Sequence, residues 1–142
     1  MDIVAALTIT MTVFFYAPEA AGINGDLIMA DGTEARIGYC SCGPRYPFGT
    51  VFELLVDMQP FGMPQTFECR DRGGKISNYA LDLVIRTGDL KEDLRIAREW
   101  GKRRVAVRMW QNWEHYVAGQ AARSTSPPAT EEASYTPAPP HR

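Results

Sequence analysis

The segment CRDRGGKISNYALDLVI, residues 69–85, is the most informative part of the sequence. It places Asp71 just before Gly73 and Gly74, a pair that permits a tight turn and close backbone approach. Asp82 then stands inside an otherwise apolar run with the composition of a strand. If Asp82 lines a groove, poor solvation raises its pKa toward the range that a general acid needs. The alternative is an outward-facing aspartate on a half-exposed strand.

Short β-rich runs, separated by glycine and proline, extend this pattern over most of the chain. Such runs predict an all-β barrel or sandwich. They cover residues 9–16, 50–58, 65–70, 81–85 and 105–110.

The first of these runs has two interpretations. Residues 3–18, IVAALTITMTVFFYAP, resemble a signal-peptide core, but no Lys or Arg precedes them. Thr8, Thr10 and Thr12 alternate with apolar residues, which favours a strand. Under the strand interpretation, the chain carries no clear export signal.

One helix is predicted, over about residues 90–100. Asp89 and Glu92 have the spacing of a capping box, and Gly101 is placed to end the helix. An apolar stripe follows at helical spacing. Its members are Leu90, Leu94, Ile96 and Ala97.

The C-terminal segment differs in composition. Residues 119–142 hold five of the ten prolines and no Leu, Ile, Val or Phe. Such a segment buries too little apolar surface to offset its ordering entropy. The sequence therefore predicts one domain over residues 1–118 and a disordered tail over 119–142.

Composition excludes several functional classes. The net charge of −2 does not indicate a nucleic-acid binder, and no apolar run is long enough for a membrane span. Three cysteines and two histidines make a weak metal set, so no metal is expected. The charge is uneven, because six bases and one acid fall within residues 95–108. That run is either a solvated surface or an attraction for an anionic polymer.

The 69–85 segment resembles the signature of the three-aspartate domain, a six-stranded double-psi β-barrel family related to membrane-bound lytic transglycosylase A. The positions that match are Asp71, Gly73, Gly74, Ile76 and Asp82. Weaker similarities occur in family order on both sides, so that the resemblance covers roughly residues 10–110. They are Tyr16–Pro18, Gly22–Gly25, Ala30–Thr33, Pro44–Thr50 and Trp100–Val107. One departure is clear, since Gly43 stands where the family has its first aspartate.

The resemblance implies a peptidoglycan lytic transglycosylase, a lyase that degrades the cell wall without a cofactor. Such enzymes cleave the β-1,4 bond between N-acetylmuramic acid and N-acetylglucosamine and leave a 1,6-anhydro product. Carried over, Asp82 protonates the glycosidic oxygen and then accepts the proton of the C6 hydroxyl. Asp71 is the neighbouring carboxylate, which raises the pKa of Asp82 or stabilises developing positive charge.

The remaining candidate site residues are substrate contacts near these motifs. Tyrosine faces pack on sugar rings, and turn residues contact polar groups, although each tyrosine has the alternative of a place in the core. The candidates are Tyr16, Tyr46, Gly73, Gly74, Lys75 and Tyr79.

The cysteines leave two alternatives. If the matched elements pack side by side, Cys69 can pair with Cys40 or Cys42 near the site, as suits an oxidising envelope compartment. Otherwise all three are reduced thiols.

Two other functions compete with the enzyme. One is a noncatalytic or expansin-like wall-binding module, which the missing first aspartate favours. The other is a structural component of a phage or envelope assembly, attached to virion or envelope proteins through the tail. In each case the expected place of action is the bacterial cell envelope, and the missing signal fits a phage-encoded endolysin or export by a partner.

Overall fold

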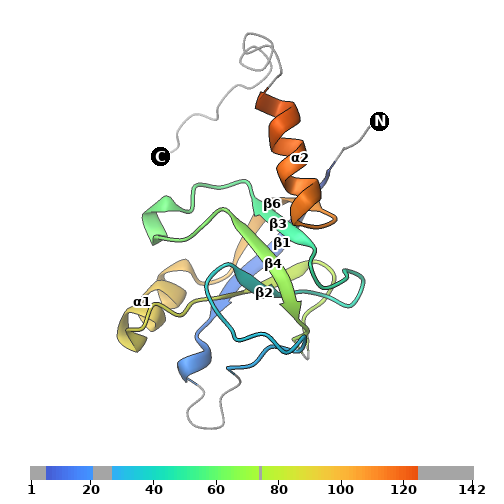
Figure 1. The fold of residues 1–142 in the computed structure, drawn as a ribbon. Coiled ribbons are helices and arrows are strands. Elements are labelled where there is room, and N and C mark those ends of the chain that lie inside the picture. The colour runs from blue at the N-terminus through green and yellow to red at the C-terminus, as the bar shows by residue number, and fades with distance from the viewer. Residues whose placement is uncertain (1–5, 21–26, 74, 125–142) are drawn as a thin grey trace.

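A closed barrel forms the body of the protein. The computed structural model describes residues 6–20, 27–73 and 75–124 (Figure 1). Its strands are β1 Leu7–Tyr16, β2 Tyr39–Ser41, β3 Val51–Leu54, β4 Thr66–Asp71, β5 Ala80–Val84 and β6 Arg103–Trp110. They close in the order β1-β5-β2-β4-β3-β6, which leaves no unpaired edge. The prediction of a mainly β protein with a six-stranded barrel is confirmed.

The barrel mixes parallel and antiparallel pairs. β1 runs parallel to β5, and β2 runs parallel to β4, whereas the other neighbours are antiparallel. β2 therefore lies between β4 and β5, although it is far from both in sequence. This arrangement brings the two ends of the 69–85 segment next to one short strand.

β1 shows why the sequence alternates. Met11 and Val13 point into the barrel and are fully buried, while Thr10 and Thr12 point outward. A strand with one buried face requires this period of two. The strand interpretation of residues 9–16 is confirmed.

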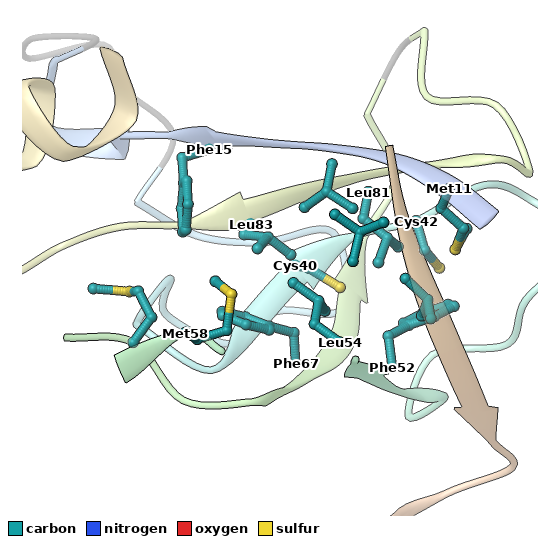
Figure 2. Close-up of a cluster of buried hydrophobic side chains, with 14 of the residues drawn as sticks. Met11, Phe15, Cys40, Cys42, Phe52, Leu54, Met58, Phe67, Leu81 and Leu83 are labelled. Atoms are coloured by element: carbon teal, nitrogen blue, oxygen red, sulfur yellow. The ribbon is translucent and has the colours of Figure 1, made fainter. Parts of the chain in front are cut away.

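The core fills the barrel with side chains from every strand. Figure 2 shows Met11, Leu81 and Leu83 converging with Phe52 and Phe67 across the interior. All five are fully buried. The inward residues of β5 are thus apolar, so Asp82 between them must point outward.

The helix α1, Leu90–Trp100, closes one end of the barrel. The Asp89 side chain accepts a hydrogen bond from the Glu92 backbone N–H (3.3 Å), so the predicted N-cap is confirmed. The Trp100 indole N–H donates to the Val13 carbonyl oxygen (2.8 Å).

The predicted apolar stripe on α1 is partly wrong. Leu90 and Leu94 are 37% exposed, and the buried side chains are Asp93, Ile96 and Trp100. Asp93 faces inward because its Oδ1 accepts hydrogen bonds from the backbone and hydroxyl of Thr87. That contact fixes the rotation of the helix and leaves the two leucines at the rim.

A second helix, α2, Trp113–Ser124, was not predicted. Asn112 caps it by accepting a hydrogen bond from the His115 N–H (2.7 Å). Its close packing on the barrel depends on Gly119, where a Cβ would overlap the Trp110 ring. The predicted tail boundary at residue 119 is therefore too early, since the helix continues to Ser124. Residues 125–142 lie outside the described residues.

Figure 1 shows that α2 projects from the barrel on a different side from α1. Neither helix, nor any other among the described residues, has the length and apolarity that crossing a membrane requires.

Candidate active site

Two predicted catalytic residues meet across β2. In the strand ladders, Ser41 is the partner of Asp71 on β4 and of Asp82 on β5. Neighbouring strands lie about 4.8 Å apart, so the backbones of the two aspartates are about 10 Å apart with Ser41 between them. A shift of register between Cys40 and Ser41 accompanies this pairing. The barrel topology therefore brings Asp71 and Asp82 to one place.

A loop covers the outer surface beside these residues. Residues 27–36 fold back on themselves through a bridge between Ile28 and Glu34, and bury Met29 and Ala35 against Val84 of β5. We call the outward surface of β2, β4 and β5, with this loop over it, the roofed face. Covering by the loop keeps water from part of the surface on which Asp82 lies.

Ion pairs hold the loop in place at both sides. Arg70 of β4 binds Asp31 in the loop (2.9 Å). Arg86, just after β5, binds Glu34 in the loop (2.9 Å) and Glu19 after β1 (2.9 Å). Arg86 also donates to the carbonyl oxygen of Ala35 (2.8 Å). Arg70 and Arg86 thus attach the roof to β4 and to the end of β5, and Arg86 also joins the segment after β1.

Asp71 at the end of β4 also holds the loop. Its Oδ1 accepts hydrogen bonds from the backbone N–H groups of Ala30 (2.9 Å) and Arg72 (2.8 Å). The carboxylate therefore has a positioning role in the roof besides its charge.

Asp82 is the chemically unusual group of the site. It is half-buried, and within the described part of the chain its buried Oδ1 has no hydrogen-bond partner. Burial, followed by the negative charge of Asp71, raises the pKa of Asp82 to about 7. Near neutral pH such a carboxyl can both give and take a proton.

Tyr16 and Cys40 complete the surroundings of Asp82. Burial raises the pKa of the Tyr16 phenol, and the charges of Asp71 and Asp82 raise it further, while a hydrogen bond with Ser41 lowers it in part. Burial also raises the pKa of the Cys40 thiol, with smaller contributions from Asp82 and Glu68. Both groups stay protonated near neutral pH, so neither is a base there.

A disulfide links the two strands that carry Ser41 and Asp71. It joins Cys42, directly after β2, to Cys69 of β4, with a Cα–Cα distance of 5.8 Å. This is one of the two pairings that the sequence left open, and Cys40 is a free, buried thiol. The Arg72 guanidinium lies 3.1 Å from the Cys42 sulfur and stacks on Phe48, 4.3 Å from the ring centre. These contacts tie β2 to β4 beside Ser41 and Asp71.

Gly43 has a structural reason to lack a side chain. A Cβ there would overlap the backbone of Ser77 and Asn78 in the turn before β5. The Asn78 side chain in turn accepts a hydrogen bond from the Arg45 N–H (2.9 Å). An aspartate at position 43 does not fit this packing.

The other predicted contacts fall in different places. Tyr16 lies beside Asp82, whereas Tyr46 is a core residue whose hydroxyl donates to the Asn78 carbonyl (2.9 Å). Of the two alternatives that the sequence left for Tyr46, the ring takes the place in the core. Tyr79 is 56% exposed and Lys75 is exposed.

The glycine pair is described only in part. Gly73 lies against Ile76, whose side chain a Cβ at position 73 would overlap. Gly74 and the Gly22–Gly25 similarity lie outside the described residues.

Three hollows lined by described residues lie away from Asp82. One of about 370 Å³ is bounded by Glu34, Tyr39 and Arg86, and another of about 490 Å³ by Tyr46, Met109 and Trp110. The third, of about 420 Å³, lies between Tyr39 and Trp113. None of the three is lined by Asp71 or Asp82. Within the described ranges, no three His, Cys, Asp or Glu side chains are grouped as metal ligands.

No protein-family model and no curated protein matches this chain. Functional inference therefore rests on the residues and their geometry.

Sequence reasoning missed two parts of the site. Ser41 lies in a strand of three residues, too short to show alternation. The roofing loop carried one local signal, because Asp31 before Gly32 and Thr33 has the composition of a turn, and its carboxylate does accept a hydrogen bond from the Thr33 N–H (3.0 Å).

Proposed function

We propose that this protein is a peptidoglycan lytic transglycosylase in which Asp82 acts first as an acid and then as a base. The observation that carries the proposal is the environment of Asp82, which is half-buried, has no hydrogen bond at Oδ1 from any described residue, and has a pKa of about 7. A catalytic acid or base works best when its pKa lies near the operating pH.

The reaction needs only one such group. Protonated Asp82 gives its proton to the glycosidic oxygen as the bond from that oxygen to the anomeric carbon breaks. The C6 hydroxyl oxygen of the same N-acetylmuramic acid then bonds to the anomeric carbon, and its proton passes to Asp82. The carboxyl group returns to its starting state, and the glycan ends in a 1,6-anhydro ring. No water is consumed and no second acid is required, unlike in two-carboxylate hydrolases.

Asp71 supports this cycle from a distance. Its charge contributes to the raised pKa of Asp82, and its hydrogen bonds to the Ala30 and Arg72 N–H groups position the roof. In the transition state, a fixed negative charge nearby also stabilises the oxocarbenium-like sugar. Asp71 needs no direct contact with the substrate to do either.

The fold supports the same assignment. We propose that the barrel is of the double-psi type, for which the parallel pairs β1–β5 and β2–β4 inside a closed barrel are the supporting feature. The place of action under this proposal is the bacterial cell envelope, where the Cys42–Cys69 disulfide is stable.

Product analysis tests the proposal. Purified protein is incubated with peptidoglycan sacculi, and the soluble products are identified by mass spectrometry. We expect anhydro-muropeptides from the wild type and a loss of about 100-fold or more with Asp82→Asn. Glu114→Gln, an exposed change of the same kind on α2, is the matched control and keeps full activity.

Other products would contradict the proposal. Reducing-end muropeptides with an added water indicate a hydrolase. Sedimentation with sacculi without any released product, in wild type and variant alike, indicates the noncatalytic wall-binding module.

A further inference from the structure

The outward side chains continue from the roofed face onto β1 and β6. Phe14 of β1 is the ladder partner of Asp82, on the side opposite to Ser41. The Lys102 ammonium group, just before β6, lies 5.4 Å from the centre of the Phe14 ring. Ser41, Asp82, Phe14 and Lys102 thus form one row across the outside of the barrel.

Beyond this row the outward residues of the described strands are mostly exposed. Thr12 is paired with Arg104, Thr10 with Ala106 and Thr8 with Arg108. The alternation that buries Met11 and Val105 puts all six on the outside. We call the outward surface of β1 and β6, from Thr8 to Thr12 and from Arg104 to Arg108, the open face.

The positive charge at the open face is only partly compensated by ion pairs. Arg108 binds Glu53 of β3 (3.4 Å). Within the described residues, neither Lys102 nor Arg104 forms an ion pair, and both are exposed. Lys102 and Arg104 are therefore available to bind an anion. They lie near the threonine hydroxyls and the Phe14 ring, on the same outer surface as Asp82.

This combination fits a neutral glycan that carries carboxylates at its side. Hydroxyls and an aromatic ring contact sugars, while Lys and Arg bind carboxylates. A nucleic acid fits less well, because its phosphates repeat along the whole backbone and would also meet Asp71 and Asp82 on the adjoining roofed face. Peptidoglycan has its charges on the peptides, which leaves the glycan itself uncharged where it meets the aspartates.

We infer that the open face, with Lys102 and Arg104, binds the peptide carboxylates of peptidoglycan next to the glycosidic bond presented to Asp82. The inference rests on the proposed function, which it extends from the reacting bond to the peptide part of the substrate. It assigns Lys102 and Arg104 to substrate binding and not to the chemical step.

Binding is measured in the Asp82→Asn background, so that sacculi stay intact. Co-sedimentation with sacculi compares Lys102→Gln with Arg104→Gln, combined, against Lys91→Gln with Arg98→Gln, combined. The control pair removes the same charge from exposed positions on α1. We expect about 10-fold weaker binding for the first pair at low salt and no change for the second, because only the first pair removes contacts with the peptide carboxylates.

Chemical blocking identifies the group that is bound. Sacculi whose carboxylates have been converted to amides should bind the background protein about as weakly as untreated sacculi bind the Lys102/Arg104 variant. Equal binding by both pairs of variants, or tighter binding of duplex DNA than of sacculi, would overturn the inference.

The two proposals can fail separately. If the wild type releases no anhydro-muropeptides, the catalytic proposal fails while the binding comparison remains measurable. If the wild type is active and the Lys102/Arg104 variant raises KM with kcat unchanged, both hold. If instead KM is unchanged, only the assignment of the open face is wrong.

Discussion

The two outer surfaces of this barrel differ in what covers them. The roofed face carries Asp71, Ser41 and Asp82 under the 27–36 loop, whereas most of the threonines and arginines on the open face are exposed. Both belong to one sheet with one core. The burial that raises the pKa of Asp82 therefore depends on the loop that covers its strand and not on the composition of the strand alone.

The boundary between the roofed face and the open face lies where β5 meets β1. Asp82 belongs to the roofed face, and its ladder partner Phe14 adjoins the open face. A polymer lying over this boundary meets a carboxyl with a raised pKa on one side and solvated cations on the other.

The largest expected effect comes from the disulfide that supports the roofed face. Replacing Cys42 and Cys69 together by serine should lower the free energy of unfolding by about 3 kcal/mol, because the bridge closes a long loop. Urea denaturation measures this change. Reductant should destabilise the wild type similarly and leave the double variant unaffected; a wild type that is indifferent to reductant would show that the bridge does not form.

A side chain at position 43 should also be costly. Gly43→Ala forces the turn at Ser77 and Asn78 away from β2, which should destabilise the protein by about 1–3 kcal/mol. Thermal unfolding compares it with Gly38→Ala, where no atom lies near the added carbon but the positive φ of 103° is strained. If Gly43→Asp were stable and more active than wild type, the structural reason given for the missing aspartate would be wrong.

The unusual pKa of Asp82 makes stability depend on pH in a stated direction. Because the folded-state pKa is raised to about 7 from 3.8, the protonated carboxyl stabilises the fold at low pH, and this stability is lost as pH rises toward 7. Asp82→Asn should therefore raise the melting temperature at pH 8 and change it little at pH 4. Glu114→Gln should show no such pattern, and a variant with the same effect at both pH values would contradict the assignment.

The smallest effect concerns the attachment of the roof. Arg86→Met removes ion pairs to Glu34 and Glu19 that are partly exposed, which should cost about 0.5 kcal/mol. Loss of these ion pairs should also loosen the 27–36 loop and let water reach Asp82. The pKa of Asp82 should then fall, and the pH profile of activity should move to lower pH. Arg95→Met, which breaks exposed pairs within α1, is the control and should leave the profile in place.

Local signals in the sequence were enough for much of the fold. The Asp89 cap and Gly101 define α1, and the alternation in residues 9–16 defines β1. The position of Asp82 within an apolar strand also indicated its unusual environment. These features depend on residues close to one another in the chain.

What could not be predicted depends on distant contacts. Ser41 lies between the aspartates only because β2 is inserted between β4 and β5. For Tyr46 the sequence left a place at the substrate and a place in the core open, and the ring lies in the core, where Phe52 packs against it (5.3 Å between centres). The helix α2 has a polar sequence whose packing depends on Gly119 beneath Trp110, a contact that helical periodicity does not reveal.

Titration of the Asp82 carboxyl carbon, followed by carbon-13 nuclear magnetic resonance, measures directly whether the pKa of this group is raised. We expect a pKa of about 7 in the wild type and a lower value in Asp71→Asn, because a neighbouring negative charge has been removed. A wild-type pKa near 4, as for an exposed aspartate, would contradict the claim that the roofed face prepares Asp82 to act as an acid and then a base.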